Sequence, residues 1–415
     1  MNKKIVSWCL FDFASSSYSA IILAVIFPVY YTGFIVGNAA GQGDVWWGRA
    51  ISASMAIVAI SSPVLGGIAD YARLRKKLLF TYTALCVISV AALYFLRKGM
   101  TAEGFTLIVL ATVGMEGGLV FYNSFLTEIA AREYQGRVSS WGFATGYAGS
   151  IASLCFALLL IDKGSLTAVW PMSALFFALF SLPAFLFLPA DCTSGVRIPE
   201  AAKAGFRQSL DTLKRIWAHR EQKKLLIAYL LYADGVNTVI VFSSIFAATT
   251  LHFSPRELIL VYLTVQFTAL CGAFLLAKPT DVWGPRKVVV LSLYLWIMVS
   301  VAAFFVASKL YFFIIASAAG LGLGTVQAAT RAFYAQFIPE GRESEYFGVY
   351  SLMGKTSAIA GPLLFGYVSS TFGSQRPAVL SVSVFFILGL LIVRTVKGGG
   401  PNVKKIMPDR PGPLS

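Results

Sequence analysis

The sequence is poor in charged residues, which make up only 13% of its 415 positions, and it contains just two histidines. These histidines, His219 and His252, fall in separate predicted loops. The chain has no Walker loop, no Cys-x-x-Cys pair and no G-x-S-x-G element. Its five cysteines show no pairing or metal-ligand spacing, so they leave the redox compartment open. These absences argue against an enzyme, a metal site, a bound cofactor and an ATP-driven pump.

Hydrophobic residues, in contrast, are abundant at 57%, and the mean hydropathy is +0.73. A soluble core of this size cannot bury so much apolar surface. Twelve apolar runs are each long enough to cross a bilayer: 5–31, 46–69, 78–97, 104–128, 139–161, 167–188, 225–249, 256–277, 287–307, 309–333, 346–370 and 376–395. The sequence therefore predicts an all-α polytopic membrane protein with twelve transmembrane helices in two six-helix halves.

The first run is longer than a signal-peptide core and lacks a small-x-small cleavage site after it, so we expect it to be retained. We expect a first half over residues 1–190, a linker over 191–224, a second half over 225–395 and a flexible tail over 396–415. Within the linker, apolar residues recur every three or four positions among basic ones, at Phe206, Leu210, Leu213 and Trp217. That spacing predicts an amphipathic helix on the inner membrane surface.

The net charge of +15 is distributed unevenly. Most of the 34 Lys and Arg residues fall on the side of the membrane that both termini share. This is the positive-inside bias, and it predicts cytoplasmic termini and a multi-pass location in the cell inner membrane. The basic residues are scattered over short loops, which argues against a nucleic-acid partner. We expect a monomer whose partners are the lipid bilayer and a small solute.

A polar island interrupts the seventh apolar run. Asp234 lies roughly 15 Å of helix from the start of that run, near the bilayer middle, where an acid is costly and usually functional. Asp234-Gly-Val-Asn-Thr238 has the order acid, any, any, amide or hydroxyl, hydroxyl, and Asp12-Phe-Ala-Ser-Ser16 in the first run has the same order. The pattern predicts one motif carried by both halves.

Two loops in corresponding positions also match. An acid at the end of one span precedes basic residues across a tight turn, at Asp70 to Arg75 and again at Asp281 to Arg286. These loops resemble the cytoplasmic signature of the major facilitator superfamily. One hypothesis is that they form a conformational latch across a helix interface, and the alternative is that they only enforce topology.

The fourth and tenth spans align through Gly114 with Gly322 and Asn123 with Arg331, and the fifth and eleventh through Gly146 with Gly354. A parallel repeat of this kind is typical of transporters that bind solute near the bilayer midplane, between the halves.

Few charged or amide residues fall inside the predicted spans, and each is a candidate for function. A carboxylate in a cavity can bind an ammonium group or accept a proton, and an arginine can hold a carboxylate bidentately. We predict a solute site from Asp12, Asp234, Asn237, Glu116, Asn123, Gln327 and Arg331, with Asp12, Asp234 and Glu116 as proton-coupling acids. Lys355 is predicted to form an ion pair, and the alternative to a solute role is internal pairing of Asp12 or Asp234 with Lys355 or Arg331.

Stretches over nearly the whole chain resemble the autophagy-related vacuolar amino-acid effluxers of fungi and their bacterial relatives, a family within the major facilitator superfamily. The residues that carry the resemblance are Trp8-Cys-Leu-Phe-Asp-Phe-Ala-Ser-Ser16, Phe27-Pro28, Tyr122-Asn123, Gly136-Arg-Val-Ser139, Gly146-Tyr147, Tyr232-Ala-Asp-Gly-Val-Asn237, Gln327, Arg331, Ile338-Pro-Glu-Gly-Arg342, Phe347-Gly348, Tyr350, Gly354-Lys355 and Gly361-Pro362. The family pattern has a tryptophan directly after the first acid and an asparagine two residues beyond it, where this chain has Phe13 and Ser15. The resemblance implies a cavity lined by spans one, four, seven and ten.

We therefore expect a proton-coupled secondary transporter that moves a small polar solute, an amino acid or related metabolite, by alternating access, with efflux as the direction the family implies. Two alternatives stay open. One is an exporter of amphipathic compounds or lipids, which the aromatic content of 14% favours. The other is a membrane scaffold or sensor that does not transport.

Overall fold

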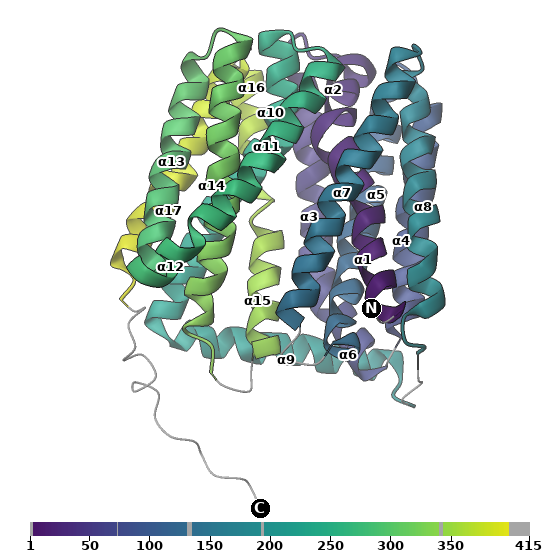
Figure 1. Cartoon of the computed structure of the whole chain (residues 1–415), viewed down its shortest axis with the longest axis vertical. Coiled ribbons are helices and arrows are strands. Elements are labelled where there is room, and N and C mark those ends of the chain that lie inside the picture. The colour runs from purple at the N-terminus through teal and green to yellow at the C-terminus, as the bar shows by residue number, and fades with distance from the viewer. Residues whose placement is uncertain (1–2, 73, 131–134, 192–194, 340–342, 398–415) are drawn as a thin grey trace, which may run out of the picture.

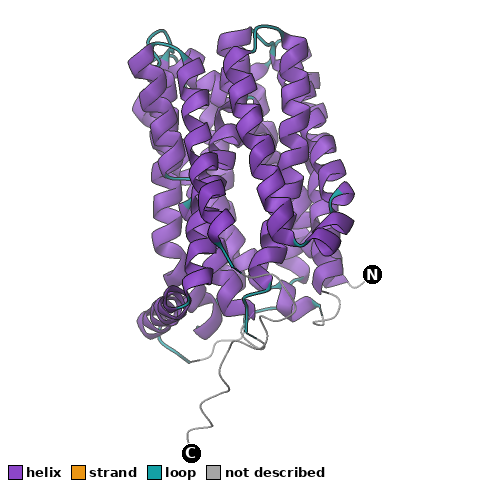
Figure 2. Cartoon of the chain, turned by 90° about the vertical axis from the view of Figure 1, so that its left-hand side faces the viewer, coloured by secondary structure: helices purple, strands orange, loops and turns teal. Residues whose placement is uncertain are grey.

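A computed structural model of the protein describes residues 3–72, 74–130, 135–191, 195–339 and 343–397. All elements in these segments are helical (Figure 2). In chain order they are α1 (Lys3–Ser17), η1 (Tyr18–Val25), α2 (Phe27–Tyr30), η2 (Tyr31–Val36), α3 (Gln42–Tyr71), α4 (Arg75–Ala92), η3 (Leu93–Phe95), α5 (Thr101–Ser124), α6 (Leu126–Ile129), α7 (Gln135–Asp162), η4 (Leu166–Ala168), α8 (Val169–Phe187), α9 (Ile198–Ala218), α10 (Arg220–Leu251), α11 (Pro255–Leu275), α12 (Ala277–Trp283), α13 (Pro285–Phe305), α14 (Lys309–Ala335), α15 (Glu343–Thr356), α16 (Ala360–Phe372) and α17 (Gln375–Thr395).

Eleven helical segments in the described residues are long and apolar enough to cross a membrane. They correspond to the predicted spans one to ten and twelve. The predicted span 346–370 is divided instead between α15 and α16, with residues 357–359 outside both helices. The eleventh crossing is thus a helix broken near its middle.

Figure 1 shows α1 to α8 on one side of the molecule and α10 to α17 on the other, with α9 crossing beneath both. We call these groups the N-half and the C-half. Both ends of the described chain lie at the face that carries α9, which we call the terminal face. The face at the other end of the helices is the opposite face. The linker helix that the sequence predicts is α9, whereas most of the predicted tail, from residue 398 on, lies outside the described residues.

The first crossing changes helical type along its length. After α1 the chain adopts a π-helix, η1, and Ile26 N–H donates to Ile21 O five residues back. Pro28 follows in the first turn of α2, where its missing N–H costs no hydrogen bond. π-helical turns inside α-helices often mark functional regions. This one lies beside α10 and α11 of the C-half.

The linker helix α9 is held against α3 by a glycine contact. Gly205 is buried in α9, and a Cβ added at Gly67 of α3 would lie 2.5 Å from the Gly205 Cα. Nearby, Tyr71 donates from its hydroxyl to Gln208 Oε1 at 3.0 Å. The apolar side chains of Phe206 and Trp217 remain exposed, as expected for an amphipathic helix at a membrane surface.

Adding a side chain at the glycine contact should destabilise the protein. Gly67→Leu forces α9 away from α3, with an expected loss of about 1–3 kcal/mol from overpacking. The neighbouring variant Gly66→Leu is the matched control, because a Cβ at Gly66 meets no atom within 4 Å. Thermal unfolding in detergent should show a lower midpoint for Gly67→Leu only. Equal midpoints for the two variants would contradict the packing described.

Candidate functional site

Asp234 holds the break in the eleventh crossing. It lies on α10 with 2% of its surface exposed, and its Oδ1 accepts a hydrogen bond from the Gly361 N–H at 2.8 Å. Gly361 is the second residue of α16, where a helix leaves N–H groups without intrahelical partners and favours negative charge. A Cβ at Gly361 would lie 2.6 Å from the same carboxylate oxygen. Position 361 therefore has no room for a side chain.

Three further hydrogen bonds involve the residues of the break. Asn237 Nδ2 on α10 donates to Ser357 Oγ at 3.2 Å, and Ser357 donates to Gly354 O at 2.7 Å. From the N-half, Ser52 Oγ on α3 donates to Ile359 O at 2.7 Å. The broken segment is thus hydrogen-bonded both to α10 of its own half and to α3 of the N-half.

Asp12 occupies the corresponding place in the N-half. Ser16 Oγ donates to Asp12 O at 2.7 Å, and Thr238 Oγ1 donates to Asp234 O at the same distance. The last hydroxyl of the duplicated motif thus makes the same hydrogen bond in both halves. Among the described residues, no Lys or Arg forms an ion pair with either acid.

The contacts of the motif correct the sequence alignment of the fifth and eleventh spans. A Cβ at Gly146 would lie 3.1 Å from Ser16 Oγ, and Gly361 occupies the equivalent place against Thr238. Gly354 instead faces the Tyr229 hydroxyl. The pairing of Gly146 with Gly354 was therefore wrong, because the break displaces the register of the eleventh crossing, and by contacts the partner of Gly146 is Gly361.

Glu116 and Lys355 form an ion pair between the halves. Lys355 Nζ lies 3.0 Å from Glu116 Oε2 and also donates to Glu116 O at 2.8 Å. The Lys355 side chain is 13% exposed and the Glu116 side chain 21%, so the pair is largely removed from solvent. Lys355 belongs to the last turn of α15, directly before the break. The alternative that Lys355 pairs with Asp12 or Asp234 is wrong, because those acids lie against α7 and α16 instead.

The remaining predicted site residues present free polar groups. Asn123 lies on α5 two turns beyond Glu116, and Gln327 and Arg331 lie one turn apart on α14; all three are exposed. On the neighbouring helices, the rings of Tyr229 and Tyr350 stack with their centroids 4.4 Å apart. In the described part of the chain, none of the three polar side chains has a protein partner. We infer that they face the space between the halves.

A cavity of about 150 Å³ lies between η1 and helices α10, α11 and α14. It is lined by Ala24, Val25, Ile240, Ser243, Ser244, Leu258, Val261, Tyr262, Val265, Gln266 and Leu323. The lining residues of α10 follow Asp234 by two to three turns, so the cavity lies on the side of Asp234 toward the opposite face. The Ser244 hydroxyl is buried without a hydrogen-bond partner in the described part of the structure.

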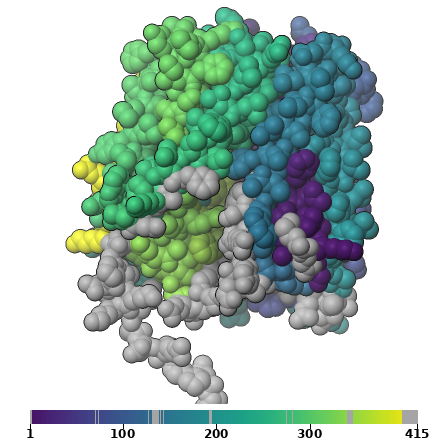
Figure 3. Space-filling model, in the orientation of Figure 1, coloured from purple at the N-terminus to yellow at the C-terminus, as the bar shows by residue number. Residues whose placement is uncertain are grey.

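Near the opposite face the halves close on one another along α3 and α16. Gly48 packs against Pro362 O, and Gly366 packs against Asp44 O. Trp47 Nε1 donates to Val241 O of α10 at 3.3 Å. Figure 3 shows the two halves abutting in the upper part of the molecule, where this face lies. We call the α3–α16 contact the seam.

A carboxylate that is buried at the seam was not predicted from the sequence. Asp44 is fully buried and accepts hydrogen bonds from Ser369 Oγ at 2.6 Å and from Gln375 Nε2 at 2.8 Å, both in the C-half. Asn38 Nδ2 donates to the other oxygen at 2.9 Å. Because Asp44 ends a polar loop, hydropathy gives no sign of its burial. The one sequence signal is an acid in the first turn of α3.

The arginines of the two predicted latch loops each contact a residue of their own half. Arg75 Nη1 lies 3.4 Å from Glu128 Oε2, and Arg286 Nη2 donates to Arg394 O. The side chains of Asp70 and Asp281 lie outside the described residues. A latch made by these four residues stays a prediction.

Residues 49–398 match the protein family described as "Vacuole effluxer Atg22 like". The chain belongs to this family. It is a membrane transporter of the major facilitator type, as the resemblance seen in the sequence implies.

Relatives of this Atg22-like chain occur in bacteria and fungi. It is 28% identical to "Uncharacterized MFS-type transporter YxiO" of Bacillus subtilis, over 94% of each chain. It is 26% identical to "Autophagy-related protein 22-1" of Aspergillus fumigatus, over 63% of this chain and 48% of the fungal one. The chain thus spans about half the length of that fungal relative.

Solved structures confirm the fold of the Atg22-like chain. The nucleoside transporter NupG superposes with a TM-score of 0.72 at 13% identity, over 95% of this chain and 99% of NupG. A bacterial homologue of the human lysosomal transporter Spinster, in an inward-facing conformation, gives 0.65 at 16% identity, over 95% and 96%. The predicted twelve-helix major facilitator fold is confirmed.

Separating Glu116 from Lys355 should destabilise this Atg22-like protein. Glu116→Gln leaves the ammonium group without its carboxylate, and Lys355→Gln leaves the carboxylate unpaired. The swap of Glu116→Lys with Lys355→Glu should recover about 0.5–3 kcal/mol relative to the sum of the single swap variants. Thermal unfolding of the set measures this coupling. Additive losses in the double variant would contradict a direct interaction.

Removing the Asp44 carboxylate should loosen the seam. Ser244 is buried on α10, the helix that Trp47 of α3 contacts. In a cysteine-free background, Ser244→Cys should therefore alkylate slowly, whereas addition of Asp44→Ala should raise its rate several-fold. A cysteine at exposed Lys98 controls for reagent and detergent effects, since its rate should not change. An unchanged rate at position 244 would show that Asp44 does not keep this face closed.

Proposed function

We propose that this Atg22-like protein is a secondary active transporter of a small polar solute, with an amino acid as first choice, that works by alternating access. The observation that carries the proposal is the asymmetry of the contacts between the halves. The seam closes the opposite face, whereas nearer the terminal face Asn123, Gln327 and Arg331 keep exposed side chains, which supports an interior open on that side. If the terminal face lies on the cytoplasmic side of the inner membrane, the structure would correspond to an inward-open state.

The interior groups suit a zwitterion. Arg331 supplies a guanidinium that can hold a carboxylate with two parallel hydrogen bonds. Asp12 supplies a carboxylate without a cationic partner, which can bind an ammonium group. Asn123 on α5 and Gln327 on α14 add neutral hydrogen-bonding groups, one from each half. An amino acid presents both charges in one small molecule, and so we favour it as the solute.

Proton coupling is proposed to use the buried acids. Asp234 accepts the Gly361 N–H and has no counter-ion among the described residues. A protonated carboxyl group is a weaker acceptor than a carboxylate. Protonation of Asp234 would therefore loosen its bond to α16 and with it the break. Protonation of Glu116 would instead neutralise its carboxylate and release Lys355. Asp12 would release a proton when it binds the ammonium group of the solute.

A second candidate is export of an amphipathic compound or lipid. The cavity beyond Asp234 favours it, because most of its lining side chains are apolar and only Ser243, Ser244, Tyr262 and Gln266 are polar. Such a cavity takes an apolar group more readily than a fully polar solute. The third possibility is a scaffold or sensor that does not transport, and the following test distinguishes it from the other two.

Transport in liposomes tests the proposal. Purified protein should accumulate labelled amino acid when a proton gradient is applied, and the double variant Asp12→Asn, Asp234→Asn should lose that accumulation while keeping the side-chain shapes. The fold control is an unchanged unfolding midpoint. Normal proton-driven uptake by the double variant would remove the roles assigned to both acids. Uptake only of amphiphiles favours the second candidate, and no uptake of either class favours the third.

A further inference from the structure

A pocket of about 460 Å³ opens at the terminal face of the C-half, away from the proposed solute site. It lies where α12 ends, α13 begins and α17 ends. Its lining residues are Trp283, Gly284, Pro285, Arg286, Lys287, Val290 and Arg394. Three of these are cations and none is acidic, so the pocket has a strong positive charge.

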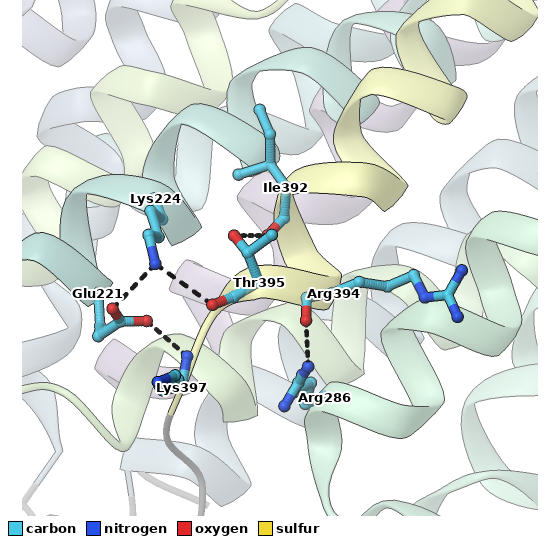
Figure 4. Close-up of polar contacts among 7 residues, drawn as sticks. All are labelled: Glu221, Lys224, Arg286, Ile392, Arg394, Thr395 and Lys397. Atoms are coloured by element: carbon cyan, nitrogen blue, oxygen red, sulfur yellow. Dashed lines mark hydrogen bonds and ion pairs between the residues drawn. The ribbon is translucent and has the colours of Figure 1, made fainter.

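The wall of the pocket is fixed by hydrogen bonds at the end of α17. Arg286 Nη2 donates to Arg394 O, and Lys224 Nζ donates to Thr395 O at 3.3 Å (Figure 4). Lys224 also pairs with Glu221 at 3.0 Å, and Glu221 accepts the Lys397 N–H. These contacts satisfy two carbonyl groups that the helix end leaves free. The Arg394 side chain extends away from them in Figure 4.

Two apolar stripes run from the pocket along the membrane-spanning surface. On α13, Lys287 begins a series spaced by four, three and four residues that continues through Leu291, Tyr294 and Met298, which are 50%, 42% and 60% exposed. On α17, Arg394 ends a similar series that contains exposed Val384, Ile387, Leu388 and Leu391. The two helices pack side by side. Each stripe therefore ends in a cation at the pocket.

We propose that this pocket binds the headgroup of an anionic phospholipid whose acyl chains lie along the α13 and α17 stripes. Guanidinium groups match phosphate oxygens in geometry, and Lys287 adds a mobile point charge. Trp283 is 52% exposed beside the cations, at the level where tryptophan favours the membrane interface. Pockets that are basic on the cytoplasmic side of transmembrane helices are suited to such headgroups.

Free phosphate shares the headgroup chemistry but does not account for the stripes. An inorganic anion would need only the three cations, whereas the site continues into exposed apolar surface on both helices. The positions of Lys287 and Arg394 at the ends of those stripes match a molecule with a charged head and two apolar chains. The lipid is therefore the assigned ligand, and free phosphate is an outcome of the test.

Native mass spectrometry of the whole protein in detergent tests the assignment. Phosphatidylglycerol should give bound species several-fold more abundant than phosphatidylcholine of the same chain length. The variant Lys287→Gln, Arg394→Gln should weaken phosphatidylglycerol binding about thirtyfold, since each of the two surface cations contributes about 1 kcal/mol to anionic lipid binding. Arg286 is left in place because it holds the end of α17.

The matched control removes two exposed cations from the opposite face, with Lys98→Gln and Lys163→Gln, and should leave lipid binding unchanged. Inorganic phosphate is added in a separate arm at the same concentration as the lipid. The proposal is overturned if the two lipids bind equally, if both double variants lose binding alike, or if phosphate displaces phosphatidylglycerol completely. The unfolding midpoint of the pocket variant is measured in the same preparation. If that midpoint is low, the conservative variant Arg394→Lys, which keeps the positive charge, should be stable and bind phosphatidylglycerol as the unaltered protein does.

Discussion

The organisation of the molecule depends on how the break at residues 357–359 is satisfied inside a membrane. In the bilayer core no water replaces a lost helical hydrogen bond, so protein groups must do so. Asp234 accepts the Gly361 N–H, Asn237 donates to Ser357, and Ser52 donates to Ile359 O across the halves. The break therefore persists because α10 and α3 together supply its hydrogen bonds.

Two of the contacts between the halves lie on the two pieces of the broken helix. On its terminal side, α15 ends at a position that brings Lys355 to Glu116 of the N-half. On its other side, α16 lies along α3 closely enough for Asp44 to bond Ser369. In the proposed mechanism, a change at Asp234 would act on both contacts because they lie on the two pieces of one broken helix. The phospholipid site is separate, since it lies on α12, α13 and α17.

Hydropathy sufficed to predict the helical fold, because each crossing must be a long apolar run whatever its neighbours. The duplicated acids were also predictable, because Asp12 and Asp234 interrupt such runs. The break was not predicted, although Pro362 has no N–H to donate to Ala358 O four residues back and so marks its position in the sequence. The groups on other helices that stabilise the break could not be read from the sequence. Nor was the partner of Lys355, because Glu116 is 239 residues away and pairing depends on helix facing. The burial of Asp44 was not predicted either, because it lies next to a polar loop in the sequence and is buried only by contacts with the C-half.

In the proposed mechanism, the two halves move as rigid bodies about the break and expose the interior to each face in turn. Double electron–electron resonance tests it most directly, with spin labels at Lys98 and Arg256 on the opposite face and at Lys77 and Gln336 on the terminal face. Transported solute or acidification should lengthen the first distance and shorten the second. If both distances stay constant under every condition of pH and solute, or change in the same sense, the account is contradicted.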